Sequence, residues 1–353
     1  MQNQIDCDTN RYLQVLDTLE QLILDHFQSP LNSTLRRLVP SVGRMFTPLP
    51  LRQAFLELDR DRSISVRRFI APSFNDIRHL LNKAQVAASS SVVKLVTFDG
   101  DCTLYKDGAN FSDSVLISQF LILLTKQSVA VVTAAGYGQE PARYEERLVG
   151  LLDAMKSSSL APEQLERFYV LGGECHYLFK YSHPAQRLVY IPHAEYQSPS
   201  VQQWSMDVAG MDALLNIAHA ELTKCAERLG LTDDVSLLRK SRAVGLVALR
   251  PLSREQLDEF CLATKHALDS SNLQIPFCCF NGGSDVWVDI GNKMIGVELL
   301  CSYLKLFPDG CLHVGDQFLG TGNDLATRSG CCTVWITNPQ ETIGVLKDLI
   351  KQI

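Results

Sequence analysis

The chain has 353 residues, 46% of them hydrophobic, which is enough to fill the cores of two or three domains. Its formal net charge of -6 argues against a general affinity for nucleic acid, because binding to a phosphate backbone requires clustered Lys and Arg. The N-terminal segment MQNQIDCDTNRYLQ lacks the basic and apolar regions of a signal peptide, and no apolar run is long enough to cross a bilayer. We therefore expect a cytoplasmic protein with neither a membrane nor a nucleic acid as partner.

The cysteines and histidines do not indicate a site for a soft metal ion. The eleven cysteines include no Cys-x-x-Cys pair, and His176, His183 and His193 lack the spacing of metal ligands. We interpret the cysteines as buried reduced thiols, and the histidines as hydrogen-bonded or exposed side chains.

The N-terminal quarter of the chain is predicted to be helical. Residues 11–27 repeat apolar side chains at the three- and four-residue steps of an amphipathic helix, namely Leu13, Leu16, Leu19, Ile23 and Phe27. A proline-punctuated stretch (LVPSVGRMFTPLPLRQAF) and a basic, polar segment (DRDRSISVRRFIAPS) follow, before a second helical run, FNDIRHLLNKAQVAA. We predict that residues 1–90 form a separate helical module.

From Val92 onward, short apolar strands alternate with helical runs. KLVTFD, SVAVVTA, CLHVGD and CTVWIT have the character of buried strands, and TIGVLKDLIKQI that of a closing helix. This pattern predicts an α/β core, a doubly wound parallel sheet covered by helices on both faces. Ligands of such sheets bind beyond the carboxyl ends of the strands, where Asp99, Thr133 and Asp316 stand.

A long insertion separates Thr133 from Lys293. It has helical runs of its own and strand-like runs such as RLVYIP, AVGLVAL and IPFCCF, so it cannot be a structureless loop. We interpret it as an α+β cap that can close over the strand ends. The predicted division is a core of residues 91–140 and 290–353 with the cap at 141–289.

Two aspartates, Asp99 and Asp101, end the first strand in KLVTFDGDCTLYKDG. A carboxylate at this place can bind Mg²⁺, act as a nucleophile or cap the next helix, but a cap accounts for only one of the two. A calcium loop of the EF-hand type would need Gly and Glu where Leu104 and Asn110 stand. Phosphoryl transfer is the remaining interpretation.

A strand followed by Asp-x-Asp-x-Thr resembles the first motif of the haloacid dehalogenase (HAD) superfamily. The other motifs follow in the expected order: Thr133 in VAVVTAAGY, Lys293 in DIGNKMIGV, and an acidic motif, HVGDQFLGTGND, with Asp316, Asn323 and Asp324. Nearly the whole chain further resembles the IMP-specific 5'-nucleotidase family, through VPSVGRMFTPLPL, SISVRRFIAPSFNDIRHLLNKAQV, FDGDCTLYKDG, GGECHYLFKY and FNGGSDVWVDIGNK.

The resemblance implies Mg²⁺-dependent hydrolysis of IMP to inosine and phosphate. Asp99 would attack the phosphorus and form an aspartyl-phosphate, and Asp101 would serve as general acid and then as general base. Asp99, the carbonyl of Asp101 and Asp316 would hold Mg²⁺, while Lys293 and Thr133 would stabilise charge in the transition state.

The predicted substrate-binding set is larger and leaves alternatives open. Its members are Asp101, Thr103, Asp107, Thr133, Gly282, Ser284, Asp285, Asp289 and Lys293. Asp289 could instead form an ion pair with Lys293, and the Gly282–Ser284 segment could form a tight turn. Tyr177 or Phe179 could stack on a purine or belong to the core. Asn323 and Asp324 could order the loop around the metal, and Asp324 could also bind it directly or through water.

Two other functions fit parts of the pattern: a HAD-type sugar-phosphate phosphatase or phosphomutase, and a nucleotide-sensing protein without turnover. The resemblance also implies a homotetramer and an ATP effector. Arg67 and Arg68 could bind that effector or form a subunit contact. The turn after Asp101 carries Cys102 where the superfamily commonly has glycine, and we interpret this cysteine as packed rather than catalytic.

Overall fold

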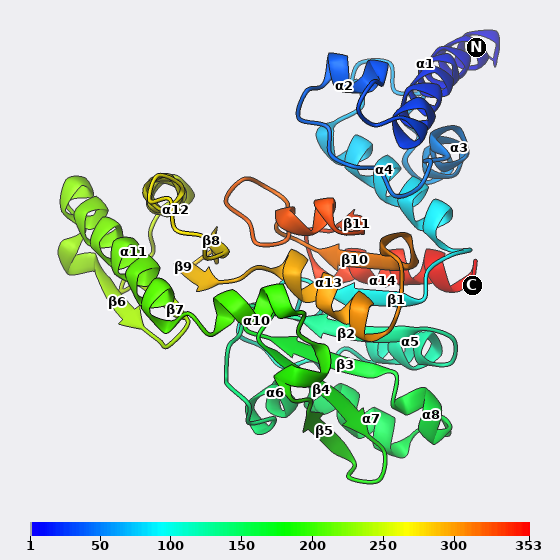
Figure 1. The fold of residues 1–353 in the computed structure, drawn as a ribbon. Helices are drawn as coiled ribbons and strands as arrows, with labels where there is room; N and C mark the ends of the chain where they lie inside the picture. Colours follow the sequence, from blue (N-terminus) through cyan, green and yellow to red (C-terminus); the bar gives the residue numbers. More distant parts are fainter. Residues whose placement is uncertain (1) are drawn as a thin grey trace.

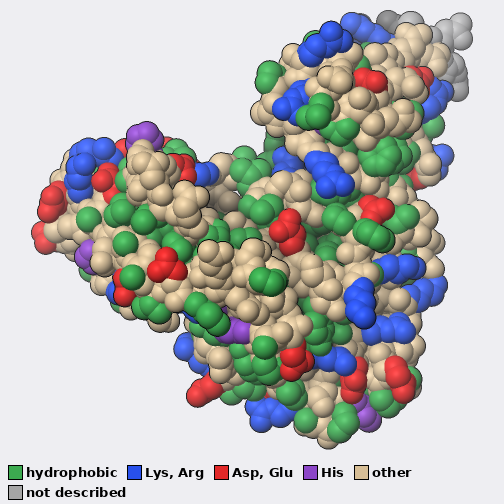
Figure 2. Space-filling view, viewed as in Figure 1, with side chains coloured by type: hydrophobic (Ala, Val, Ile, Leu, Met, Phe, Trp, Pro, Cys, Tyr) green, Lys and Arg blue, Asp and Glu red, His purple; other side chains and the backbone are tan. Residues whose placement is uncertain are grey.

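The computed structural model describes the backbone of residues 2–353 and the side chains from Asn10 onward. Two separate sheets and a group of N-terminal helices make up the molecule (Figure 1). The helices at the N-terminus and the part built on the smaller sheet project from the body as two lobes with an open notch between them (Figure 2). No helix in the part of the chain that the structure describes is long and apolar enough to span a membrane.

The large sheet has seven strands in the order β11-β10-β1-β2-β3-β4-β5. The first five are parallel, whereas β4 and β5 are antiparallel to their neighbours. The strand bounds are β1 (Leu95–Phe98), β2 (Ser128–Val132), β3 (Phe168–Gly172), β4 (Tyr177–Ser182), β5 (Arg187–Tyr190), β10 (Cys311–Gly315) and β11 (Cys332–Trp335). The predicted parallel sheet is thus confirmed for the four strands that the sequence pattern identified.

Helices cover both faces of this sheet, as the alternation of side chains along β1 demonstrates. Val96 and Phe98 belong to a core cluster with α5 (Ser114–Leu124), α7 (Val149–Ser157) and α14 (Pro339–Ile350), whereas Leu95 belongs to a cluster with α13 (Lys293–Tyr303). The shorter helices around the sheet are α6 (Ala142–Arg147), α8 (Pro162–Leu165), α9 (His193–Tyr196), α10 (Pro199–Ser205), η2 (Pro308–Gly310) and η3 (Leu325–Ser329).

The small sheet is antiparallel throughout, in the order β6-β7-β9-β8. Its strands are β6 (Val235–Arg239), β7 (Ala243–Ala248), β8 (Phe277–Asn281) and β9 (Asp285–Ile290). They share a core with α11 (Val208–Leu229) and α12 (Arg254–Asp269), and η1 (Thr232–Asp234) precedes β6. The expected strands AVGLVAL and IPFCCF are found here as β7 and β8.

The third strand expected in the insertion, RLVYIP, lies elsewhere. It forms β5, which together with β3 and β4 extends the large sheet. Its assignment to the cap was therefore wrong, although its character as a strand was right. Alternating apolar side chains identify a strand, but the sheet that it joins depends on contacts distant in sequence.

Four helices form the N-terminal group: α1 (Gln2–Gln28), α2 (Thr34–Leu38), α3 (Leu51–Arg62) and α4 (Phe74–Ser89). The predicted helices at 11–27 and from Phe74 are confirmed as parts of α1 and α4. Helix α3 was not predicted, although its buried residues follow the helical steps, namely Leu51, Ala54, Phe55 and Leu58. The cysteines whose side chains are described are all free thiols, as expected, and Cys102 alone among them is not buried.

Arg67 and Arg68 differ in their surroundings. Arg67 Nη1 lies 2.6 Å from Asp76 Oδ2, and this hydrogen bond holds the pKa of Asp76 below its usual range. Arg68 is exposed, with its guanidinium 5.5 Å from the ring centre of Phe69. Arg67 is thus committed to a partner within the chain, and only Arg68 presents its charge to solvent.

Helix α4 covers the edge of the large sheet. Asn82 exchanges two hydrogen bonds with the backbone of Trp335 in the edge strand β11, at 2.6 and 3.0 Å. Buried Arg78 adds a two-pronged ion pair to Glu341 of α14, at 2.8 and 2.9 Å. The indole Nε1 of Trp335 donates to the carbonyl of Asp316 at 2.8 Å, so the N-terminal helices are connected to the strand ends.

We expect Glu341→Gln to destabilise the protein by about 2 kcal/mol at pH 7, because it leaves the buried charge of Arg78 without its partner. Burial raises the pKa of Glu341, but hydrogen bonds from His79 and Arg78 outweigh burial and hold it below its usual range. The stabilisation by this carboxylate is therefore complete above its unfolded pKa, about 4.3, and is lost as the pH falls below that value. Urea unfolding between pH 7 and pH 3 measures how the free energy of unfolding depends on pH. This dependence should be weaker for Glu341→Gln than for the wild type or for the control variant Glu163→Gln, which changes an exposed residue. Wild-type stability of Glu341→Gln at pH 7 would contradict the prediction.

Candidate active site

The loop after β1 carries the first pair of aspartates. The backbone N–H of Asp99 donates to the carbonyl of Val314 at 2.9 Å, so the sheet ladder continues to this residue and fixes its position. A side chain at Gly100 would place its Cβ 2.5 Å from Tyr105 Oη, which explains the glycine. Cys102 has φ of 60°, the left-handed conformation that the absent glycine would adopt without strain. Asp101 Oδ1 accepts a hydrogen bond from the N–H of Gly108 at 3.1 Å.

Lys293 begins α13 and is fully buried between two carboxylates. Its Nζ lies 2.5 Å from Asp99 Oδ1 and 2.7 Å from Asp324 Oδ1. Lys293 therefore forms its ion pairs with these two residues rather than with Asp289, the alternative partner that the sequence suggested. Burial lowers the pKa of Lys293, but the charges of Asp324 and Asp99 outweigh it and keep the pKa well above the usual value.

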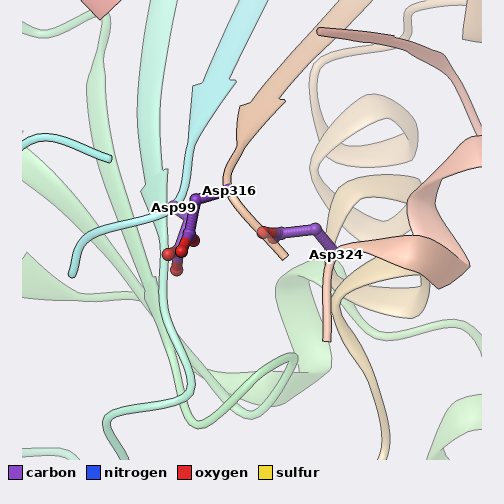
Figure 3. A group of neighbouring side chains, drawn as sticks. All are labelled: Asp99, Asp316 and Asp324. Atoms are coloured by element: carbon purple, nitrogen blue, oxygen red, sulfur yellow. The ribbon is translucent and has the colours of Figure 1, made fainter. Parts of the chain in front are cut away.

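Three carboxylates converge at the strand ends. One oxygen from each of Asp99, Asp316 and Asp324 lies within 4.8 Å of the others. Figure 3 shows Asp99 and Asp316 side by side after their two strands, with Asp324 pointing toward them from the loop that follows. Asp316 Oδ1 is buried and has no hydrogen-bond partner among the described residues. Burial and the neighbouring negative charges raise the pKa values of Asp99 and Asp316.

These features fit a hard divalent cation. Asp99 and Asp316 offer carboxylate oxygens, the ligands that Mg²⁺ prefers, and one buried oxygen of Asp316 lacks a partner. A cation there would remove the repulsion that raises the two pKa values. Asp324 differs, since both of its oxygens already accept hydrogen bonds, from Lys293, His313 and the N–H of Gln317.

His313 and Glu174 are buried at this site, and the sequence analysis missed both. His313 on β10 connects Thr97 Oγ1, 2.8 Å from its Nδ1, with Asp324 Oδ1, 3.0 Å from its Nε2. Burial lowers the pKa of His313, and the hydrogen bond with Asp324 opposes this shift in part. Glu174, in the turn between β3 and β4, accepts a hydrogen bond from Asn323 at 3.1 Å. The signal in both cases was a polar residue within an apolar strand region, in CLHVGD and GGECHYLF.

The other predicted residues lie in two places. Thr133 follows β2, and its Oγ1 accepts a hydrogen bond from the N–H of Ala135 at 3.1 Å. It lines a small hollow together with Asp101, Tyr105, Tyr137, Tyr144 and Arg147. Thr103 is fully buried beneath the loop, and its carbonyl accepts a hydrogen bond from Thr342 of α14 at 2.7 Å.

The segment 281–285 forms the turn between β8 and β9, with Gly283 at φ of 93°. Burial and then the charge of Asp107 raise the pKa of Asp285, so a residue of the loop after β1 acts on an acidic residue of the small sheet. The N–H of Asn281 also donates to the carbonyl of Thr321 at 2.8 Å, which connects this turn to the loop before Asp324. The turn that the glycines suggested is thus present.

A hollow of about 40 Å³ lies between the two sheets. Its lining comes from both, and includes Gly136, Gly173, Tyr177, Lys240, Arg242 and Asp289. Tyr177 therefore faces this hollow, whereas Phe179 is completely buried in the core. Arg242 contacts His176 Nδ1 at 3.2 Å and the carbonyl of Ser205 at 3.3 Å, and burial lowers the pKa of His176 to about 3.

Comparison with known proteins gives a consistent result over nearly the whole chain. The family model described as IMP-specific 5'-nucleotidase matches residues 1–346. IMP-specific 5'-nucleotidase 1 of Yarrowia lipolytica is 43% identical over 361 residues, covering 97% of this chain and 85% of that protein. N-terminally truncated, IMP-bound IMP-nucleotidase of Plasmodium falciparum has a TM-score of 0.92 at 36% identity, covering 98% of this chain and 92% of that one. The ATP-bound form of that nucleotidase has a TM-score of 0.85 at 36% identity, over 96% of this chain and 79% of that one.

Proposed function

Because this chain belongs to the IMP-specific 5'-nucleotidase family, a family of hydrolases, we propose that it hydrolyses IMP to inosine and phosphate through an aspartyl-phosphate on Asp99. The observation that carries the mechanism is the buried assembly of Asp99, Lys293 and Asp324 beside Asp316. The IMP-bound state of the similar nucleotidase from P. falciparum supports the substrate.

Each residue of the site has a separate role in the proposed reaction. Lys293 holds one oxygen of Asp99, which leaves the other to attack the phosphorus as the bond to the 5'-oxygen breaks. Burial raises the pKa of Asp101, which favours its role as the general acid that gives a proton to the leaving 5'-oxygen. The resulting carboxylate takes a proton from the water that attacks the phosphorus, which releases phosphate and free Asp99. Lys293 and Thr133 stabilise charge on the phosphoryl oxygens.

We propose Mg²⁺ as the cation, held by Asp99, the carbonyl of Asp101 and Asp316, with Asp324 orienting Lys293. When bound, Mg²⁺ neutralises charge on the carboxylates and the phosphoryl oxygens, so that two anions can approach.

We expect a chelator to lower hydrolysis at least about 10³-fold, because loss of the cation removes several kcal/mol of charge stabilisation. Added Mg²⁺ should restore the rate. Asp316→Asn should raise the Mg²⁺ concentration that gives the half-maximal rate by at least about tenfold, whereas Asp309→Asn, outside the site, should not change it. Undiminished turnover of the chelated protein would rule out the metal.

The experiment that tests the substrate is phosphate release from IMP, GMP, AMP, pyrimidine monophosphates and hexose phosphates. Strong preference for IMP supports the proposal. Preference for hexose phosphates would favour a sugar-phosphate phosphatase or phosphomutase, and absence of turnover with tight nucleotide binding would favour a sensing protein.

We propose a HAD-like organisation with three parts. The helical module comprises residues 1–90, the core residues 91–207 and 291–353, and the cap residues 208–290. The cap is thus smaller than the sequence suggested, because β3–β5 pair within the large sheet. The hollow between the sheets, which Asp289 lines, supports a nucleoside site there. Asp107, Gly282, Ser284 and Asp285 do not line this hollow, and they stay candidate contacts from the sequence, with the charge of Asp107 acting on Asp285.

ATP as an effector is a further proposal, supported by the ATP-bound state of the similar P. falciparum nucleotidase. The contacts from α4 through Trp335 to the carbonyl of Asp316 give the helical module a physical connection to the site. Rates measured with and without ATP in the wild type and in Arg68→Ala test this, and light scattering tests the homotetramer.

A further inference from the structure

Two contacting side chains near the site, Glu174 and Asn323, each have an unpaired oxygen. Glu174 Oε1 accepts from Asn323 Nδ2 at 3.1 Å, while Glu174 Oε2 and Asn323 Oδ1 have no partner among the described residues. Glu174 is fully buried and Asn323 is 5% exposed. With an ionised Glu174 both orphaned atoms would be acceptors, and buried acceptors without donors are rare and destabilising.

A single proton resolves this arrangement. If Glu174 Oε2 carries it, the O–H donates to Asn323 Oδ1 while Asn323 Nδ2 donates to Glu174 Oε1. A carboxylic acid and a primary amide then form a ring of two parallel hydrogen bonds, and every polar atom of both side chains has a partner.

We infer that Glu174 is a protonated positioning residue, paired through two hydrogen bonds with Asn323. The environment of Glu174 favours the protonated form, because burial raises its pKa to about 8. The charged groups that act on it are Lys293, which favours its ionised form, and Asp289 and Asp324, which oppose it. Lys293 already has two closer carboxylate partners in Asp99 and Asp324, so it does not require a third.

The pair joins three elements that carry proposed catalytic groups. The N–H of Glu174 donates to the carbonyl of Thr133 at 3.0 Å. A Cβ on Gly296 of α13 would lie 2.3 Å from the Glu174 carbonyl, so this helix, which begins with Lys293, packs directly on the turn. Asn323 immediately precedes Asp324, which holds Lys293. Glu174 therefore sets the spacing between Thr133, Lys293 and the loop of Asp316 and Asp324.

The test compares Glu174→Gln with Glu174→Leu. Glutamine reproduces the ring of two hydrogen bonds without a proton, so we expect its kcat to lie within about threefold of the wild type. Leucine breaks the ring, and we expect a loss of about 10-fold to 100-fold in kcat. Asn323→Leu should lose as much, and the double variant Glu174→Leu/Asn323→Leu no more than either single one. A kcat of Glu174→Gln as low as that of Glu174→Leu would overturn the inference.

The protonation state also has a direct readout that needs no substrate. The infrared difference spectrum of wild type minus Glu174→Gln at pH 7 should contain the carbonyl band of a protonated carboxyl group. A carboxylate band in its place would overturn the inference. The kinetic comparison rests on the proposed phosphatase activity, whereas the spectrum does not, so failure of that activity and failure of this pairing can be told apart.

Discussion

Asp99→Asn is expected to lower phosphate release at least about 10⁴-fold, because an amide does not replace a carboxylate as the nucleophile. The amide keeps the size of the side chain, and its oxygen can still accept a hydrogen bond from Lys293. The exposed control Asp233→Asn should keep wild-type activity. Substantial hydrolysis by Asp99→Asn would refute the nucleophile assignment.

The same substitution should stabilise the metal-free protein at neutral pH. Burial, opposed in part by Lys293, raises the pKa of Asp99 in the folded state above its unfolded value. For a carboxyl group shifted in this direction, its contribution to stability is present below the unfolded pKa and is lost as the pH rises through the folded pKa. Asparagine has no charge to bury, so thermal unfolding in chelator should give a higher Tm for Asp99→Asn than for the wild type at pH 8, but not at pH 4. A lower Tm at pH 8 would contradict this account of the site.

The strand ends of the site were predictable because the relevant signals are local. An apolar run followed at once by Asp99, Thr133 or Asp316 places a polar group at the carboxyl end of a strand in a parallel sheet. This inference does not depend on how the other segments of the chain fold. The family resemblance is confirmed by the match over residues 1–346. The roles of the individual residues remain predictions.

What the sequence did not reveal depends on contacts between distant segments. Glu174 meets Asn323, and His313 meets Thr97, across separations that no periodicity encodes. The three additional strands of the large sheet, β3–β5, were missed for the same reason. Their sequences would also fit a separate antiparallel domain, and only their partners in the fold distinguish the two cases. Asp289 was four residues from Lys293, yet the lysine turns toward Asp99 and Asp324 at the start of α13.

Lys293→Met should impair both catalysis and stability. It removes the cation that stabilises phosphoryl charge, and we expect a loss of about 10²-fold to 10³-fold in kcat. It also leaves Asp99 and Asp324 buried without their partner, at an expected destabilisation of about 3–5 kcal/mol. Urea unfolding and phosphate release measure the two effects separately.

The stability of Lys293→Met should fall as the pH rises, whereas the ion pair of the wild type stabilises the fold at higher pH. Burial raises the pKa of Asp324, but Lys293 and the hydrogen bond from His313 outweigh burial and hold it below the usual range. In the wild type this carboxylate stabilises the fold above its unfolded pKa, about 3.9. Without Lys293 the balance shifts toward burial, so the folded pKa rises and Lys293→Met should be less stable at pH 8 than at pH 5. Equal destabilisation at both pH values would show that lost packing, rather than lost charge, is responsible.

Asp324→Asn provides the decisive comparison, because it removes the most deeply buried of the stranded charges. In the double variant Lys293→Met/Asp324→Asn, much of the lost stability should return, since of the two carboxylates that contacted Lys293 Asp99 alone remains opposite the apolar side chain. Activity should not return, because the cation that acts on the phosphoryl group is still absent. Recovery of both would mean that Lys293 only balances buried charge, whereas recovery of stability alone assigns it a second, chemical role.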